Sequence, residues 1–322
     1  MPAKAGDRRD RPGDRGRVVA LDDLSFEVPE GSVTGLLGPN GSGKTTTVAI
    51  LSTALLPDRG EALVRGLDVV SQAAAVRGRI GFAGQFAAVD ANLTGGENLR
   101  LIGRLSRLPR RMARERAEEL LERFGLARAA DRLARTYSGG MRRRLDVAAA
   151  LMHRPPVLFL DEPTTGLDPE SRVQLWELVG DLVRDGTTVL LTTQYLEEAD
   201  ALADRVVIID HGRVVEAGTP RALRQRVGSA VVQLTFDDEA GAARAERQLA
   251  AGRYAPERSG AVVRLASADG SAAIVGAVRA LDGAAPDPVA VEIREPTLDD
   301  VFLALTGNAA QATTTQQPRG AR

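Results

Sequence analysis

The 322-residue sequence has no cysteine, and only two of its 42 basic residues, Lys4 and Lys44, are lysines. Without cysteine the chain cannot form a disulfide, a thiolate metal site or a cysteine nucleophile. Positive and negative charges nearly balance, with 43 acidic residues and a net charge of −1. Because there is no overall basic field, we do not expect nonspecific binding of nucleic acid.

Long hydrophobic runs are also missing from the sequence. Apolar stretches such as 206–209 have the length of a strand, and none approaches the roughly 18–20 residues that a membrane-spanning helix needs. Residues 1–17 are polar and charge-mixed, and they lack the apolar core of a secretory signal. We therefore expect a soluble or peripheral chain, for which any transmembrane function depends on a partner.

Strand-like and helix-like patterns alternate along residues 17–228, with a largely helical part at about 90–152. This alternation predicts a mostly parallel sheet covered by helices. Residues 229–306 predict a second, smaller α/β domain. The segment 1–16, rich in Arg, Asp and Gly, is expected to be disordered, and the tail 307–322 to be flexible. The strands of the first domain are expected at 18–28, 32–37, 63–64, 80–82, 157–160, 187–192 and 206–209.

The run from Gly38 to Thr45 matches the phosphate-binding pattern G-x-x-x-x-G-K-[ST], between an apolar strand and a helical stretch at 45–51. Glycines let the backbone N–H groups turn toward phosphates, and the helix adds its N-terminal dipole. Lys44 supplies a compact charge for the β- and γ-phosphates, and the Thr45 hydroxyl can bind Mg²⁺. The residues expected to bind the nucleotide here are Gly38, Pro39, Asn40, Gly41, Ser42, Gly43, Lys44, Thr45 and Thr46.

Two carboxylates, Asp161 and Glu162, end the apolar strand at 157–160. Acidic residues at a strand end are common in turns, but a nucleoside triphosphatase needs one carboxylate for Mg²⁺ and one group to activate water. The carboxyl edge of a parallel sheet brings such residues to the phosphates. We therefore expect Asp161 to hold the metal and Glu162 to act as the base.

Ser138 is followed by two glycines, Gly139 and Gly140, at the start of another helix. By itself this pattern is explained by a serine N-cap. A helix N-terminus with two glycines is also an anion cradle without a lysine. The residues alone leave both interpretations open.

Taken in order, these motifs resemble the nucleotide-binding subunits of ATP-binding cassette (ABC) transporters, from about residue 18 to about residue 225. The resemblance implies a P-loop NTPase fold of the ABC type, ATP and Mg²⁺ as cofactors, and hydrolysis of ATP. It also implies an ATP-sandwich dimer, in which Ser138, Gly139 and Gly140 form the signature loop. The expected partner is a separate multi-span membrane permease, which would place the chain peripherally at the cytoplasmic face of the cell membrane.

The resemblance assigns further roles residue by residue. Gln85 matches the Q-loop glutamine, which touches Mg²⁺ and the membrane partner, and Asp168 matches the D-loop aspartate, although it could simply cap a helix. Gln194 stands where the family usually has its switch histidine. An amide can hydrogen-bond a phosphate or a water but cannot take a proton, which leaves Glu162 as the base. Gln194 and Lys44 are the other two expected catalytic residues.

Three stretches, 137–146, 192–200 and 295–303, are similar to the daunorubicin/doxorubicin-resistance ATP-binding subunits, which share the glutamine at position 194. This resemblance implies export of a hydrophobic drug or antibiotic. Thr297 in the last stretch can be interpreted as a simple helix N-cap or as part of a segment that contacts the second subunit or the permease.

One departure from the family concerns the adenine ring. Residues 1–25 contain no Phe, Tyr or Trp, so stacking would depend on an arginine such as Arg15 or Arg17. A second function class is a soluble ABC ATPase acting on DNA or ribosomes, and a third is a nonhydrolytic binding module. The single cassette and balanced charge argue against the second, and the intact carboxylates, Asp161 and Glu162, argue against the third.

Overall fold

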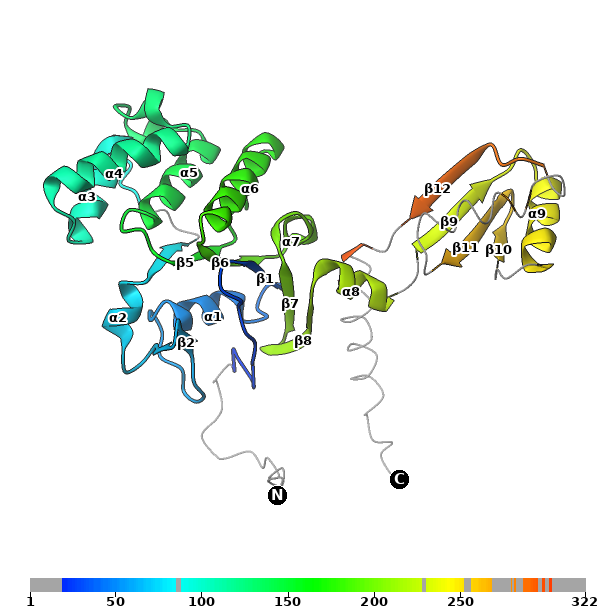
Figure 1. Cartoon of the computed structure of the whole chain (residues 1–322), viewed down its shortest axis with the longest axis horizontal. Helices are drawn as coiled ribbons and strands as arrows, with labels where there is room; N and C mark the ends of the chain where they lie inside the picture. Colours follow the sequence, from blue (N-terminus) through cyan, green and yellow to red (C-terminus); the bar gives the residue numbers. More distant parts are fainter. Residues whose placement is uncertain are drawn as a thin grey trace, which may run out of the picture.

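The computed structural model describes residues 19–84, 88–227, 230–251, 256–267 and 286–294, and the single positions 279, 281, 297, 298, 301 and 302. Within these residues no helix is both long enough and apolar enough to cross a lipid bilayer. Two separate sheets are the main features of the structure (Figure 1).

The first sheet has six strands in the order β4-β5-β6-β1-β7-β8. All neighbouring pairs are parallel except β7 and β8, so the expectation of a mostly parallel sheet is confirmed. Its strands are β1 (Val33–Leu37), β4 (Ile80–Ala83), β5 (Val157–Asp161), β6 (Thr188–Thr193), β7 (Arg205–Asp210) and β8 (Arg213–Gly218). A short hairpin, β2 (Leu63–Val64) with β3 (Leu67–Asp68), accompanies this sheet.

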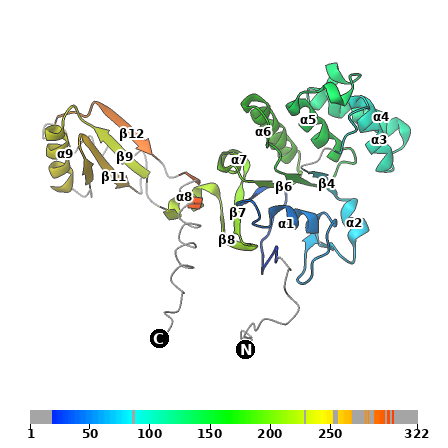
Figure 2. The ribbon, with the colours of Figure 1, turned by 180° about the vertical axis from the view of Figure 1, so that it is seen from behind.

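Both faces of this sheet are covered, because residues of one strand alternate between two hydrophobic clusters. In β1, Leu37 belongs to a cluster with α5 (Gly139–Ala150), α6 (Pro169–Arg184) and α7 (Leu196–Leu202), whereas Leu36 belongs to the opposite one. The opposite cluster includes side chains of α1 (Lys44–Leu51) and α2 (Ala73–Arg77). Figures 1 and 2 show these helices on the two sides of the sheet. Near-continuous apolar strands are the expected consequence of burial on both faces.

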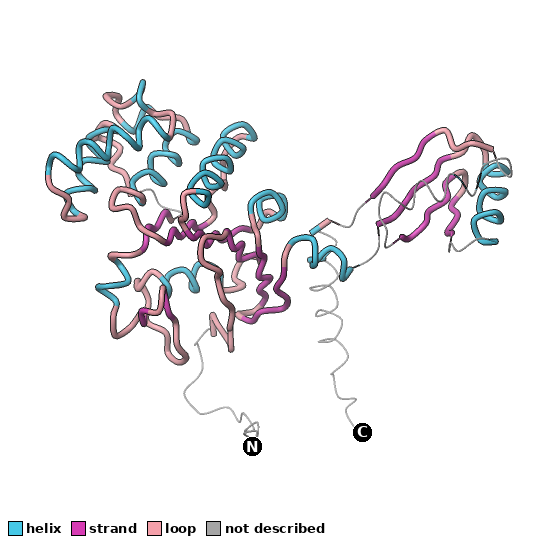
Figure 3. Tube along the Cα trace, viewed as in Figure 1, coloured by secondary structure: helices cyan, strands magenta, loops and turns pink. Residues whose placement is uncertain are grey.

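Residues 90–152 are largely helical, as expected, and their helices gather at one end of the molecule (Figure 3). The first helix begins at a capping box, in which the Thr94 hydroxyl accepts from the Glu97 N–H and the Glu97 carboxylate accepts from the Thr94 N–H. The elements of this part are α3 (Gly95–Leu105), α4 (Arg110–Arg123), the 3₁₀ helices η1 (Ala127–Ala129) and η2 (Ala134–Thr136), and α5.

The expectation of a strand at 18–28 is wrong for its described part, 19–28, which pairs with no strand. Leu24, Phe26 and Val28 are alternating and half-buried, and they pack against the cluster on the α1 face. The alternating pattern therefore reports contact with the core rather than a place in the sheet.

The second sheet has four antiparallel strands in the order β10-β11-β9-β12, and helix α9 packs against it. Its elements are β9 (Ala230–Thr235), α9 (Glu239–Ala251), β10 (Pro256–Ser259), β11 (Val262–Ser267) and β12 (Ala290–Arg294). Helix α8 (Pro220–Val227), which the patterns did not predict, precedes it. The division of the chain at 228/229 stays a prediction, as do the terminal segments 1–16 and 307–322, which lie outside the described residues.

The chain returns to the first domain after β12. Leu298 and Val301 are buried, and both belong to the hydrophobic cluster on the α5–α7 face of the six-stranded sheet. Phe302 packs against the same cluster. Residues that follow the second sheet in sequence therefore complete the core of the first.

Candidate functional site

The candidate site lies at the carboxyl ends of three adjacent strands, β5, β6 and β1. Each of these strands leads directly into a predicted motif: β5 ends at Asp161, β6 precedes Gln194, and β1 precedes Gly38. The pairing of Asp161 with Thr192, and of Leu37 with Thr193, sets these ends level with one another. In parallel sheets this edge is the usual place for a ligand.

The phosphate-binding loop has a backbone that only glycine accommodates at several positions. Gly41 and Gly43 have φ values of 81° and 106°, in the left-handed region that other residues rarely adopt. A Cβ at Gly43 would also lie 2.6 Å from the Leu21 side chain, and one at Gly38 would lie 2.3 Å from the Ile209 carbonyl. The loop is therefore folded tightly against its neighbours and leads directly into α1, for which Gly43 is the N-cap.

Lys44 is buried beneath this loop, with 4% of its surface exposed. Its ammonium donates to the carbonyls of Gly38 at 2.7 Å and Pro39 at 3.0 Å. Burial lowers the pKa of Lys44, and the carboxylates of Glu162 and Asp161 act in the opposite direction. The lysine therefore braces the loop while its charge lies close to both acids.

Asp161 is the centre of a polar cluster that joins β5, β6 and the start of α1. It is buried, and its Oδ1 accepts from the hydroxyl of Thr192 and, at 3.4 Å, from that of Thr45. Thr192 also accepts a hydrogen bond of 3.0 Å from the Glu162 N–H. Thr192 was not singled out in the sequence, where it is one of three threonines in β6 and nothing distinguishes it from the other two.

Glu162 has an unusual backbone, with a φ of 47° in the left-handed region. Its N–H also donates to the Thr192 carbonyl, and its carboxylate accepts from the Thr165 hydroxyl at 3.4 Å. The side chain is half-buried and close enough to Lys44 to affect that residue's pKa. A strained residue of this kind persists only where its surroundings hold it, and functional sites are a common place for one.

The phosphate-binding loop and the residues next to it have the groups needed to bind an anion and a divalent cation. Ser42 Oγ is buried and has no hydrogen-bond partner among the described residues, so a donor is left for a ligand in the loop. The Thr45 hydroxyl and the Asp161 carboxylate provide two oxygen ligands. Mg²⁺ is typically held by one or two such groups together with phosphate oxygens and water. No larger cluster of three or more acidic or histidine ligands occurs within the part of the chain that the structure describes.

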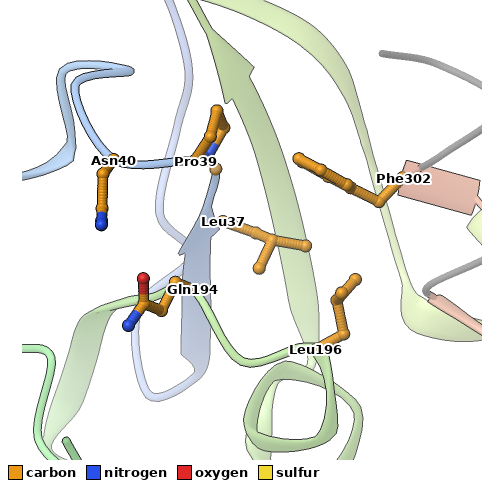
Figure 4. A pocket seen from close by; sticks show the side chains of 7 residues that line it. Leu37, Pro39, Asn40, Gln194, Leu196 and Phe302 are labelled. Carbon is orange, nitrogen blue, oxygen red and sulfur yellow. The ribbon is translucent and has the colours of Figure 1, made fainter. Parts of the chain in front are cut away.

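A pocket of about 270 Å³ opens beside the loop, and Gln194 lies on its wall across from Pro39 and Asn40 (Figure 4). The apolar side of the pocket is formed by Leu37, Leu196 and Phe302. Phe302 belongs to the segment that returns from the second sheet. Gln194 and the phosphate-binding loop are therefore neighbours.

We expect Gln194→Ala to lower the rate of ATP hydrolysis about 10-fold, because it removes a hydrogen-bonding amide beside the phosphate-binding loop. Gln194→His should restore activity and add a pH dependence that the amide cannot supply. The ratio of the histidine variant's rate to the native rate should change with a midpoint near pH 6.5, the ordinary pKa of histidine. Steady-state rates between pH 5.5 and 8.5 measure this, and a constant ratio would contradict the prediction.

Ser138, Gly140 and Asp168 belong to a second group of contacts. Ser138 caps α5 by accepting from the Met141 N–H, so the simple N-cap interpretation is confirmed. Asp168 caps α6 in the same way, by accepting from the N–H and the hydroxyl of Ser171, and both bonds lower its pKa. A Cβ on Gly140 would lie 2.2 Å from the Ser171 hydroxyl, whereas one on Gly139 would meet open space. The start of α5 is therefore packed against the start of α6.

Gln85 lies outside the described residues, as do Arg15 and Arg17, so their predicted roles stay predictions. The residues on either side of the Gln85 loop are described, and both contact α5. Arg143 donates to the Gly84 carbonyl, and Asp146 accepts from the Ala88 N–H. Neither of these two residues of α5 was identified as functional from the sequence.

Comparison with known proteins gives consistent matches. A model of the family described as ABC transporter matches residues 21–165. The daunorubicin/doxorubicin resistance ATP-binding protein DrrA of Streptomyces peucetius is 50% identical over 300 residues, which cover 92% of this chain and 91% of that protein. The doxorubicin resistance ATP-binding protein DrrA of Mycobacterium tuberculosis is 47% identical over 307 residues, 93% of this chain and 92% of that protein.

The fold has a solved counterpart in a dimeric ATP-binding cassette in a post-hydrolysis state, bound to ADP and Pi. That structure superposes with a TM-score of 0.57 and 28% identity, and the match covers 62% of this chain and 90% of that one. The matches to the two resistance proteins extend over nearly the whole chain, whereas this match in structure covers a smaller part of it.

Proposed function

This chain belongs to the ABC transporter family of ATP-binding subunits, which hydrolyse ATP, and from that premise we propose that it energises the export of a hydrophobic drug or antibiotic through a separate membrane permease. The observation that carries the catalytic part is the convergence of Lys44, Thr45, Asp161 and Glu162 at one sheet edge. The export part rests on the relatives, which are named as resistance proteins for daunorubicin and doxorubicin.

Each residue of the site has one role in this proposal. Lys44 and the loop N–H groups bind the β- and γ-phosphates, and Thr45 and Asp161 hold Mg²⁺, with Gln85 as a further ligand. Mg²⁺, when bound, neutralises part of the charge on the phosphates. Glu162 takes a proton from the attacking water, and Gln194 orients the water or the γ-phosphate through its amide. Hydrolysis then depends on positioning and on charge rather than on a covalent intermediate.

The signature loop acts on a second copy of the chain. We propose that Ser138, Gly139 and Gly140 contact the nucleotide held by the Lys44 loop of that copy, and that Asp168 contacts its partner across the same interface. The α5 N-terminus supports this proposal, because its N–H groups favour an anion and the space beside Gly139 is open. A dimeric state of a related cassette with ADP and Pi is consistent with it.

ATP binding would close this dimer and ATP hydrolysis would open it. These movements would switch the permease between its inward-facing and outward-facing states. We propose that the chain lies peripherally at the cytoplasmic face of the cell membrane, held there by the permease. We also propose that residues 17–228 form the ATP-binding domain and residues 229–306 an accessory domain.

The test is transport by the reconstituted complex. We expect the chain to co-purify with a multi-span permease from a neighbouring reading frame, and inverted vesicles that contain both to take up daunorubicin only when ATP is present. Vesicles with the Lys44→Ala variant are the matched control and should show only background uptake. Co-purification with ribosomes or DNA, without ATP-dependent uptake, would contradict the proposal and favour a non-transport ATPase.

A further inference from the structure

Arg143 lies on α5, the helix that Ser138 caps, and its side chain contacts the end of β5, the strand that carries Asp161. Its side chain is 12% exposed, and it uses separate N–H groups for separate acceptors. Nε donates to the Pro163 carbonyl at 2.9 Å, and Nη2 donates to the Asp161 carbonyl at 3.1 Å. Nη1 donates to the Gly84 carbonyl at 2.6 Å. A guanidinium has the planar fork of donors that such a set of acceptors requires.

The residue between the two carbonyls at Asp161 and Pro163 is Glu162. Its φ of 47° lies in a region that non-glycine residues rarely occupy, so its environment must hold it there. On one side, the Glu162 N–H is fixed by Thr192. On the other, Arg143 holds the carbonyls of the two neighbouring residues, Asp161 and Pro163. The direction of the Glu162 carboxylate follows from this backbone, because the side chain has few other fixed contacts.

Asp146, one turn further along α5, completes the arrangement. It is 2% exposed and lies 3.3 Å from the Arg143 guanidinium. Its Oδ1 accepts from the Ala88 N–H at 2.7 Å. Burial raises the pKa of Asp146, whereas the Ala88 N–H and Arg143 act in the opposite direction. The buried pair thus contacts the residues on both sides of the Gln85 loop, at Gly84 and Ala88, as well as the Glu162 backbone.

We propose that Arg143, oriented by Asp146, is a positioning residue for Glu162: it holds the strained backbone that directs the carboxylate toward the phosphate site. The pair also ties the helix that starts at the signature loop to the flanks of the Gln85 loop. The inference rests on the proposed function, in which Glu162 is the base. A purely structural role, in which Arg143 only anchors α5 to the sheet, predicts a loss of stability without a specific link to Glu162.

The first experiment compares Arg143→Gln and Arg143→Lys with Arg114→Gln, an exposed arginine of α4 whose ion pair with Glu118 is on the surface. In the full chain, we expect both Arg143 variants to lower kcat for ATP hydrolysis by about 10- to 100-fold, since a small misplacement of a catalytic group has effects of that size. KM should stay within about 3-fold, because the phosphate-binding loop is unchanged. Arg114→Gln should match the native chain. Full activity in Arg143→Lys would overturn the proposal, because the three donors of an ammonium share one nitrogen and cannot reproduce the wider planar spread of the guanidinium donors.

The second experiment separates positioning from stability with a double-mutant cycle. In a Glu162→Gln background, Arg143→Gln should change the residual rate by less than about 2-fold, since there is no base left to position. If Arg143→Gln lowers that residual rate by the same factor as in the native background, the proposal is wrong. If Glu162→Gln alone hydrolyses ATP at the native rate, the base assignment fails, which is a separate result.

Asp146→Asn keeps the test valid if the Arg143 variants do not fold. It removes the charge that orients the guanidinium but retains an oxygen for the Ala88 N–H. We expect kcat to fall by about 5- to 10-fold, again only when Glu162 is present. A native rate in folded Asp146→Asn would overturn the role of the pair.

Discussion

Replacing Glu162 by glutamine is expected to lower ATP hydrolysis by about 10²- to 10⁴-fold, the range lost with a general base, while ATP still binds. The amide has the same shape as the carboxylate but cannot take a proton from water. Lys44, Thr45 and the loop N–H groups, which hold the phosphates, are untouched by this change. Phosphate release under single-turnover conditions measures the loss, and equilibrium binding of ATP checks that the site is intact.

The same variant should accumulate a nucleotide-bound dimer, since the step that separates the two copies is blocked. Light scattering with Mg²⁺ and ATP should report twice the mass of the nucleotide-free chain. Glu177→Gln, which changes an exposed glutamate of α6, is the matched control and should behave like the native chain. A Glu162→Gln variant that hydrolyses at the native rate would contradict the base assignment, and one that stays monomeric with bound ATP would contradict the sandwich mechanism.

Lys44→Ala is expected to weaken ATP binding by about 10- to 100-fold, the value of one or two charge-assisted hydrogen bonds to phosphate. Hydrolysis should fall by about 10³-fold, because the same ammonium stabilises charge in the transition state. The variant also removes the ammonium donor from the carbonyls of Gly38 and Pro39, of which Pro39 keeps its hydrogen bond from the Ser42 N–H, so the loop should become less stable.

Titration with a fluorescent ATP analogue measures the affinity, and phosphate release measures the rate. Since the chain has only two lysines, Lys4→Ala is a control that makes the identical substitution elsewhere, and it should have no effect. Lys44→Arg tests whether charge alone is sufficient. We expect it to fail, because the larger planar group does not fit a site that is 4% exposed. Native activity in Lys44→Arg would show that the compact ammonium is not required.

Motifs made of consecutive residues could be predicted from the sequence. The glycines at 41 and 43 occupy the left-handed backbone that the pattern requires, and Asp161 and Glu162 follow a buried strand as expected. Helix capping was one of two interpretations left open for Asp168 and Ser138, and both side chains do cap helices. In each of these cases a few neighbouring residues contain the physical cause, which is a backbone angle, a cap or a change of hydrophobic period.

Other features were missed or mistaken because their cause is distant in sequence. The alternation at 24–28 resembled a strand, although these side chains only cover a core cluster. The packing of Leu298 and Val301 against the first domain could not be predicted, since nothing in the sequence of that segment indicates which part of the chain it contacts.

The sequence by itself therefore determined the parts of the site: the loop around Lys44, the acidic pair at the end of β5, and the amide at position 194. Only the tertiary structure decided how they meet. Because β6 pairs with β5, Thr192 contacts both Asp161 and Glu162, and because α5 packs beside β4, Arg143 reaches the carbonyls of Asp161 and Pro163 on either side of Glu162. Local backbone preferences depend on adjacent residues, whereas strand order and long-range hydrogen bonds arise only when the whole chain packs.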